Sequence, residues 1–216
     1  MVSYFLKLIV KGYLWLTDLL YGPFAWAYEF VAWLVSFGLW AKWRKDTLGY
    51  LVPGKALEIG FGTGALLVEM KQRGYDVCGL EPSHQMLRVT KRRFRREGIS
   101  VKIVRAKADD IPFPNAYFST ILATFPSNYI FREGTLREIK RVLAVDGHVV
   151  LVGFGVVFKS GFKRWLTGWF LNRELAAFLD YFSSIAQGLG FSSDLIYHQG
   201  DIYTLPIVIL EKTHDR

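Results

Sequence analysis

Cysteine is nearly absent from this sequence. Cys78 is the one cysteine among 216 residues. A lone cysteine excludes an internal disulfide and any zinc cluster built on several cysteines. Such sparse usage is typical of proteins in a reducing compartment, so we expect the protein to be cytoplasmic.

A long hydrophobic run is also missing. The aromatic-rich first 43 residues are interrupted by charges at Lys7, Lys11, Asp18 and Glu29. The longest charge-free stretch there, Phe30–Ala41, has 12 residues, whereas a membrane-spanning helix needs about 20. A lysine-rich start followed by a small-residue cleavage site is absent, so we expect no signal peptide. Two interpretations remain, namely helices packed on the domain or helices lying in a membrane interface.

Acidic side chains are too few to balance the basic ones. There are 27 Lys and Arg against 19 Asp and Glu, which gives a formal net charge of +8. This excess favours an anionic partner such as nucleic acid, an anionic membrane leaflet or an acidic substrate. Repeats, low-complexity segments and linkers are not evident, and the length suits one core with an appendage.

From residue 55 onward, short apolar runs alternate with helical segments, which is typical of a parallel sheet with crossover helices. The expected strands are Lys55–Ile59, Asp76–Glu81, Val101–Arg105, Phe118–Ala123 and His148–Gly153. The expected helices are Gly64–Arg73, Ser83–Glu97, Glu133–Leu143 and about Asn172–Gly188. We expect a turn at "AVDGH", with Gly147 in a left-handed conformation. The final segment, around Gly200 and Asp201, is expected to form an antiparallel hairpin.

A glycine-rich loop follows the first expected strand. The stretch "LEIGFGTGAL" places Gly60, Gly62 and Gly64 at alternate positions between a strand and a helix. Glycine permits a tight turn and a close approach of a ligand, and the N–H groups of the next helix favour an anionic group. The same letters satisfy the dinucleotide pattern G-x-G-x-x-A through Gly60, Gly62 and Ala65. Glu81, at the end of the second strand, can accept hydrogen bonds from ribose hydroxyls in either case.

Two further features distinguish these possibilities. Glu58 precedes the glycines to give E-x-G-x-G-x-G, and "GLEPSHQML" and "ADDIPF" follow in order. This arrangement resembles the class I S-adenosylmethionine-dependent methyltransferases, and most of all their quinone-biosynthesis and phospholipid N-methyltransferase branch. The resemblance covers about residues 21 to 153. It implies a Rossmann-like, seven-stranded, mostly parallel α/β sheet with helices on both faces and an antiparallel terminal strand.

The resemblance also implies a binding site for S-adenosylmethionine. In it, the glycines and Thr63 line the methionine moiety, Glu58 holds the amino end, and Glu81 holds the ribose. The adenine is flanked by Pro82 and Met86, and its edge is contacted by Ala108 and Asp109. One departure is Lys107, which stands where the family usually has an aspartate, so that adenine recognition falls to Asp109 or Asp110. A local turn or helix-capping role is the alternative for these two aspartates.

An aromatic lid is implied upstream. "YGPFAWAYE" matches the family pattern Y-x-x-x-A-x-x-Y-D through Tyr21, Ala25, Tyr28 and Glu29. In relatives this segment folds over the cofactor, so Tyr28 is expected to reach the methionine carboxylate, and a plain core role is its alternative. We therefore divide the chain into a helical lid or membrane-interacting segment, residues 1–48, and a methyltransferase domain, residues 49–216.

Two basic segments remain to be explained. In "VVFKSGFKRWLTGWF", within the expected lid insertion 156–172, apolar residues recur at helical spacing beside Lys159, Lys163 and Arg164. This pattern predicts either a helix in a membrane interface or a helix that closes a hydrophobic pocket. The run "KRRFRRE" at residues 91–97 indicates a solvated basic face, or attraction to an anionic membrane.

Methyl transfer depends mainly on aligning the acceptor with the methyl group in a dry pocket, so no catalytic residue is assigned. Metal-ligand spacing is absent, and no nucleic acid is expected as a partner. Candidate acceptor contacts are Tyr21, Asn128, Tyr129 and Trp165. We expect a hydrophobic or amphipathic acceptor, such as a lipid or quinone precursor, met at the inner membrane leaflet. The alternatives are a soluble small-molecule substrate, a nicotinamide-dependent oxidoreductase, and a membrane-binding protein without catalysis.

Overall fold

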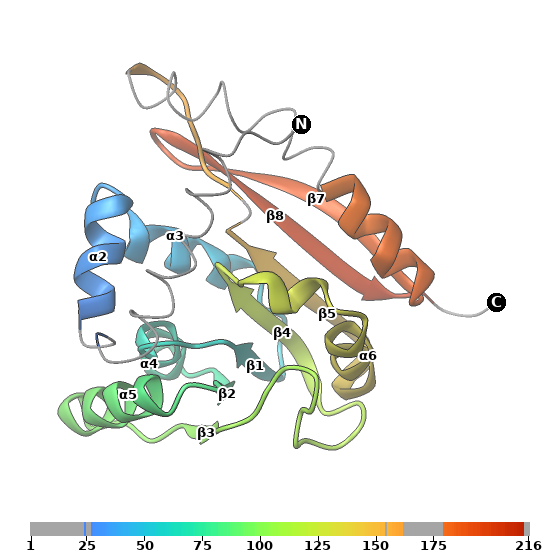
Figure 1. The fold of residues 1–216 in the computed structure, drawn as a ribbon, viewed down its shortest axis with the longest axis horizontal. Helices are drawn as coiled ribbons and strands as arrows, with labels where there is room; N and C mark the ends of the chain where they lie inside the picture. Colours follow the sequence, from blue (N-terminus) through green and yellow to red (C-terminus); the bar gives the residue numbers. More distant parts are fainter. Residues whose placement is uncertain (1–23, 25–26, 154, 162–178, 214–216) are drawn as a thin grey trace, which may run out of the picture.

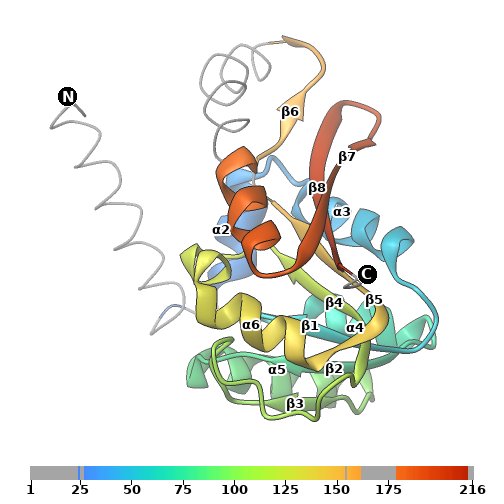
Figure 2. The ribbon, with the colours of Figure 1, turned by 90° about the vertical axis from the view of Figure 1, so that its right-hand side faces the viewer.

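The chain folds into an α/β structure around one twisted sheet (Figures 1 and 2). The computed structural model describes residues 24, 27–153, 155–161 and 179–213. The sheet order is β3-β2-β1-β4-β5-β8-β6, and β7 also pairs with β8. The strands are β1 (Lys55–Ile59), β2 (Asp76–Leu80), β3 (Lys102–Val104), β4 (Phe118–Thr124), β5 (Leu143–Val152), β6 (Val157–Phe158), β7 (Phe191–Gln199) and β8 (Tyr203–Lys212).

The first five strands are parallel, and the C-terminal strands reverse direction. The pairs β1–β2, β1–β4, β2–β3 and β4–β5 are parallel. Strand β8 is antiparallel to β5, and β7 is antiparallel to β8. The predicted Rossmann-like sheet and terminal hairpin are thus confirmed. The sheet has eight strands rather than seven because the two-residue β6 also pairs with β8.

Helices cover both faces of the sheet, which explains why the strands are apolar along their length. On one face, α6 (Glu133–Val142) and the helix at 179–188 pack against Ile121 and Leu151. On the other face, α4 (Ala65–Gln72) and α5 (His84–Glu97) pack against Leu122 and Val150. Consecutive residues of one strand, such as Ile121 and Leu122 of β4, therefore pack into different hydrophobic cores on opposite faces of the sheet.

The N-terminal helices lie against the carboxyl ends of the parallel strands (Figure 1). They are α2 (Tyr28–Val35) and α3 (Trp40–Asp46), followed by the 3-10 turn η2 (Thr47–Tyr50). Trp40 packs on Phe125, just after β4, with ring centroids 4.1 Å apart. Because ligands of parallel α/β sheets bind at these strand ends, α2 and α3 lie where a lid would be placed.

The prediction of a left-handed turn at Gly147 is wrong. Strand β5 begins at Leu143 and runs through this position, and Gly147 does not have a positive φ. Its pairing with β4 is irregular, since Leu143 pairs with Phe118 whereas His148 pairs with Thr120. A Cβ on Gly147 would lie 3.0 Å from the carbonyl oxygens of Phe118 and Ser119. Close backbone approach, rather than a left-handed turn, requires glycine here.

Tyr203 ties the C-terminal hairpin to α3. Its side chain is fully buried, and its hydroxyl donates to Asp46 at the end of α3. Tyr203→Phe should lower the free energy of unfolding by about 1–2 kcal/mol, because a partly buried carboxylate loses a donor. Tyr197→Phe, at a position that is 53% exposed, is the matched control and should change stability by less than about 0.5 kcal/mol. Equal losses in urea unfolding of the two variants would contradict this role.

Candidate active site

The loop between β1 and α4 needs its three glycines for different reasons. Gly60, Gly62 and Gly64 have φ angles of +72°, +54° and +70°, a region that glycine adopts without strain. A Cβ on Gly60 would lie 2.7 Å from the Tyr129 hydroxyl, and one on Gly64 would lie 2.5 Å from Thr90. A Cβ on Gly62 would meet nothing within 4 Å. Gly62 therefore exposes its backbone to open space, as a ligand cradle requires.

Glu58 is a buried carboxylate that the protein leaves partly unsatisfied. Its side chain is 2% exposed, and its Oε2 atom has no hydrogen-bond partner. Burial raises the pKa of Glu58 to about 8, with a further rise from Glu81, while Arg44 and Thr124 act in the opposite direction. An unpartnered buried oxygen costs free energy unless a ligand supplies a donor. Glu58 is thus prepared to receive a cationic or N–H group.

Arg44 and Glu29 join the N-terminal helices to the glycine loop. Arg44 Nη1 and Nη2 donate to the two oxygens of Glu29 at 2.9 and 3.3 Å, and the Thr63 hydroxyl also donates to Glu29. Burial alone would raise the pKa of Glu29, but the hydrogen bond and charge of Arg44 hold it below its usual value. This ion pair fixes α2 and α3 over the loop.

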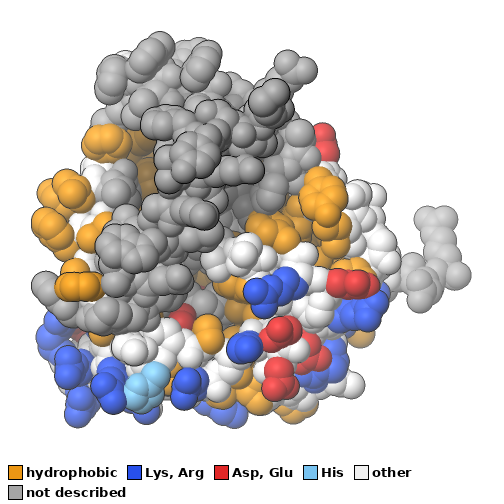
Figure 3. Space-filling view, in the orientation of Figure 1, with side chains coloured by type: hydrophobic (Ala, Val, Ile, Leu, Met, Phe, Trp, Pro, Cys, Tyr) orange, Lys and Arg blue, Asp and Glu red, His pale blue; other side chains and the backbone are white. Residues whose placement is uncertain are grey.

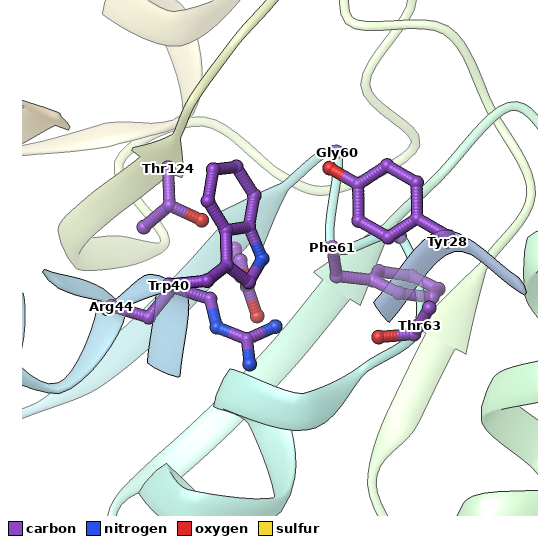
Figure 4. Close-up of a pocket in the computed structure, with 9 residues that line it drawn as sticks. Tyr28, Trp40, Arg44, Gly60, Phe61, Thr63 and Thr124 are labelled. Carbon is purple, nitrogen blue, oxygen red and sulfur yellow. The ribbon is translucent and has the colours of Figure 1, made fainter. Parts of the chain in front are cut away.

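Two cavities meet at Gly60. The smaller, of about 20 Å³, lies beneath α2 and α3, where Trp40, Arg44 and Tyr28 converge on the loop (Figure 4). The larger, of about 250 Å³, opens beside the ends of β1 and β2. The smaller cavity is lined by Tyr28, Trp40, Arg44, Glu58, Gly60, Phe61, Gly62, Thr63 and Thr124. The larger is lined by Ile59, Gly60, Leu80, Pro82, Lys107, Ala108, Asp109, Ser127, Asn128, Tyr129, Arg132 and Thr135.

Most of the predicted cofactor residues line these cavities. Tyr28, Glu58, Gly62 and Thr63 line the smaller cavity, and Gly60 lines both. Pro82, Ala108 and Asp109 line the larger cavity, as do the candidate acceptor contacts Asn128 and Tyr129. The remaining described candidates, Gly64, Glu81, Met86 and Asp110, line neither cavity. Tyr21 and Trp165 lie outside the described residues, as does most of the predicted insertion 156–172.

Glu81 holds the glycine loop in this structure. It is fully buried at the end of β2, and its two oxygens accept from the N–H groups of Gly62, at 3.1 Å, and Ser83, at 2.9 Å. Burial raises the pKa of Glu81, while these two hydrogen bonds lower it. The same carboxylate is therefore fixed immediately behind the larger cavity, next to Pro82.

The two aspartates after β3 differ in position. Asp109 faces the larger cavity and lies 3.9 Å from Arg132 in an ion pair. Asp110 belongs to a turn in which its N–H donates to the carbonyl of Lys107. Lys107, which replaces the family's aspartate, also lines the larger cavity.

Sequence reasoning missed three contributors to the site. Trp40 and Arg44 belong to no motif, because only folding brings α3 to the glycine loop. Phe125 follows β4 directly and has a φ of +52°, unusual for an aromatic residue. The one signal in the sequence that could have identified Phe125 is its position directly after a parallel strand, where ligands of such sheets bind.

The comparisons with known proteins agree with this geometry. Residues 57–151 match the family described as "Methyltransferase domain". A demethylmenaquinone methyltransferase of Thermus thermophilus is 30% identical over 151 residues, which are 63% of this chain and 69% of that protein. One from Thermotoga maritima is 30% identical over 131 residues, which are 58% of this chain and 56% of that protein. The chain thus spans between about half and two thirds of the length of these relatives.

Solved structures of low sequence identity share the fold. A geranyl diphosphate methyltransferase bound to S-adenosylmethionine superposes with a TM-score of 0.56 at 16% identity, over 80% of this chain and 84% of that one. A Haemonchus contortus phosphoethanolamine N-methyltransferase gives a TM-score of 0.61 at 15% identity, over 82% and 53%.

Fold, glycine loop and sequence relatives converge, and the chain belongs to the class I S-adenosylmethionine-dependent methyltransferases. Within that class it falls in the branch of the quinone-biosynthesis methyltransferases. The predicted enzyme class and cofactor are confirmed. The glycine loop is therefore not a dinucleotide site, and the oxidoreductase alternative is set aside.

The ion pair between Arg44 and Glu29 provides a test of the lid attachment. Arg44→Met should lower the free energy of unfolding by about 2 kcal/mol, because the half-buried Glu29 loses two charge-assisted hydrogen bonds and keeps the Thr63 hydroxyl and Arg93, 3.9 Å away, as partners. The control is Lys45→Met on the same helix, whose exposed pair with Glu69 should contribute less than about 1 kcal/mol. Chemical denaturation of both variants checks this, and similar losses would show that the Arg44 pair has no special role.

Proposed function

We propose that this enzyme methylates an apolar, ring-containing acceptor of the quinone-precursor type, which it meets at a membrane surface. The observation that carries the proposal is the aromatic wall beside the glycine loop. Trp40 packs on Phe125 with ring centroids 4.1 Å apart and ring planes tilted by 30°, and Tyr28 meets Trp40 edge-on at 6.2 Å. Flat aromatic walls favour flat apolar ligands. The relatives named demethylmenaquinone methyltransferases support the same acceptor class.

The residues around the cavities fit S-adenosylmethionine. We assign the methionine moiety to the smaller cavity, where the unpartnered Oε2 of Glu58 accepts from the ammonium group and Arg44 faces the carboxylate. The open side of Gly62 accommodates the ligand backbone. The smaller cavity now holds about 20 Å³, room for one small polar group, so Tyr28 and Trp40 must shift when the cofactor enters.

The adenosine is assigned to the larger cavity. Pro82 and Ala108 provide its apolar surface, and Asp109 provides an acceptor at its edge. Glu81 holds the loop at Gly62 through one oxygen, and a ribose hydroxyl would compete for the other. Met86, in the first turn of α5, is fully buried and lines neither cavity, so no contact with the adenine is assigned to it.

The cofactor supplies an electrophilic methyl group on a sulfonium, and the protein contributes alignment and a dry environment. Trp40, Phe125 and Tyr28 exclude water from the acceptor side. The described part of the predicted lid segment 1–48, namely α2 and α3, acts as the lid in this proposal, since it forms the roof of the smaller cavity; residues 1–23 and 25–26 lie outside the described residues. Ser127, Asn128 and Tyr129 line the larger cavity from the loop after β4, so in this proposal they border the adenosine rather than the aromatic wall.

Labelled S-adenosylmethionine mixed with the protein and a total lipid extract tests the proposal. Label should enter the organic phase, in a band that migrates with a methylated quinone. Trp40→Ala should reduce this transfer about tenfold or more by opening the wall, whereas Trp33→Ala, at an exposed site, should not when the acceptor is dispersed in detergent. Label confined to the aqueous phase would instead favour the soluble-substrate alternative.

A further inference from the structure

The outer face of α2 carries its apolar side chains into solvent. Phe30, Trp33, Leu34 and Phe37 are 65%, 56%, 57% and 55% exposed. The spacing of Phe30, Trp33 and Leu34 places them on one side of α2, and Phe37 follows two residues after the helix ends. The opposite side holds Glu29, which pairs with Arg44, and the buried Ala32. The orientation of α2 is thus fixed by its polar contact to the site, and its most hydrophobic stripe points outward.

The neighbouring helix α5 carries a stripe of exposed cationic side chains. Arg88, Lys91, Arg92 and Arg95 are exposed at the same three-and-four spacing, while Met86, Leu87, Thr90 and Phe94 are buried beneath them. Within the described part of the chain none of these four cations forms an ion pair. Their positive charge is therefore available to a partner.

The two stripes are held side by side. Arg93 on α5 lies 3.9 Å from Glu29 on α2, so the first turn of α2 is attached to the middle of α5. Hydrophobic side chains gather over α2, and Lys and Arg side chains gather over α5 directly below it (Figure 3). The combination is one continuous surface with an apolar part and a cationic part.

We infer that this α2–α5 surface docks the enzyme on an anionic phospholipid bilayer. Exposed Phe, Trp and Leu side chains insert at the headgroup level, and nearby cations are attracted by anionic lipid. A second copy of the chain fits less well, because a symmetric contact would bring the two α5 stripes of like charge together. Among the residues that the structure describes, no helix combines the length and the hydrophobicity that crossing a membrane requires.

The docking surface adds a membrane-binding site to the proposed function, and its role in delivering an acceptor rests on that function. Tyr28, in the first turn of α2, lines the smaller cavity, whereas Phe30 and Trp33 point away from it. The bilayer surface would therefore lie next to the lid, and an apolar acceptor would reach the site without crossing water.

Vesicle co-sedimentation tests the inference directly. Full-length protein should bind vesicles of phosphatidylcholine containing about one third phosphatidylglycerol and should bind phosphatidylcholine alone much more weakly. Arg88→Gln combined with Arg92→Gln and Arg95→Gln should weaken binding on the order of 100-fold, since each cation near the surface contributes independently. Phe30→Ser with Trp33→Ser should weaken it at least about tenfold, including at high salt where the electrostatic part is screened.

The matched control is Tyr181→Ser with Tyr197→Ser. These tyrosines are 65% and 53% exposed but belong to the 179–188 helix and to β7, not to α2 or α5. The control should bind vesicles like the parent protein. Equal losses in the control and the α2 variant, or no loss in either stripe variant, would overturn the inference.

Two additional measurements separate this inference from the proposed function and from another partner. All variants should methylate a detergent-dispersed acceptor at the parent rate, so failure of vesicle binding with intact methylation would overturn only the docking surface. Sedimentation velocity without lipid should show the same mass for parent and Phe30→Ser with Trp33→Ser. A dimeric parent protein and a monomeric variant would instead show that the surface mediates self-association.

Discussion

Gly62→Val should abolish detectable binding of S-adenosylmethionine while leaving the protein folded. An added Cβ on Gly62 would meet no protein atom within 4 Å, and the valine methyl groups would extend from it into the volume assigned to the cofactor. The residue also has a φ of +54°, and a left-handed conformation at a non-glycine residue costs about 1–2 kcal/mol of stability. We expect an affinity loss of more than about 100-fold in calorimetry, far above what the strain alone would cause.

Gly98→Val provides the matched control for this substitution. Gly98 ends α5 with a φ of +65°, and a Cβ there also meets nothing within 4 Å. The two variants should therefore lose similar stability, yet only Gly62→Val should lose the cofactor. If both variants bind S-adenosylmethionine normally, the open side of Gly62 is not the cofactor cradle.

Glu58→Gln should stabilise the free protein near pH 8 and weaken cofactor binding at the same time. The pKa of Glu58 is raised to about 8 in the folded protein, whereas an exposed glutamate has a pKa of about 4.3. Between these values the folded state binds more protons than the unfolded state, so stability falls as the pH rises. At about 1.4 kcal/mol per pKa unit the full effect is roughly 5 kcal/mol, and the stability is lost progressively from about pH 4 until the loss is complete above pH 8. The glutamine variant lacks this loss.

The same carboxylate gives cofactor binding its pH dependence. The ammonium group assigned to Glu58 prefers the ionised carboxylate, so affinity in the parent protein should rise with pH up to about 8 and binding should release a proton. Glu58→Gln should weaken binding about 100-fold near pH 8 and remove the rise. Glu69→Gln, which alters a surface pair with Lys45 and Arg73, is the control. Parallel pH profiles in the parent and Glu58→Gln proteins would contradict the assignment.

Local signals in the sequence were sufficient for the first β-loop-α unit. The strand Lys55–Ile59 was predicted with its observed bounds, and the expected helix Gly64–Arg73 is observed as Ala65–Gln72. Apolar runs, glycine and helix-forming residues act over a few positions, so the pattern alone specifies them. The order of motifs from this unit through "GLEPSHQML" to "ADDIPF" also led to the correct enzyme class.

Contacts between distant segments could not be predicted in this way. Gly147 is required by carbonyls of β4, almost thirty residues earlier, and not by a turn of its own. Arg44 meets Glu29 only because α2 and α3 fold back on each other, and Phe125 joins the aromatic wall only because Trp40 packs on it. The outward apolar stripe of α2 depends on the same pairing, since the sequence does not say which side of an aromatic helix faces the protein.

A crystal structure of the protein soaked with S-adenosylhomocysteine would test the central claim most directly. The account predicts that the amino group of the ligand lies within hydrogen-bonding distance of Glu58 Oε2, with the ligand passing over Gly60 and Gly62 and the adenine beside Pro82 and Asp109. Density for the ligand away from the β1–α4 loop, or no density at saturating concentration, would contradict it.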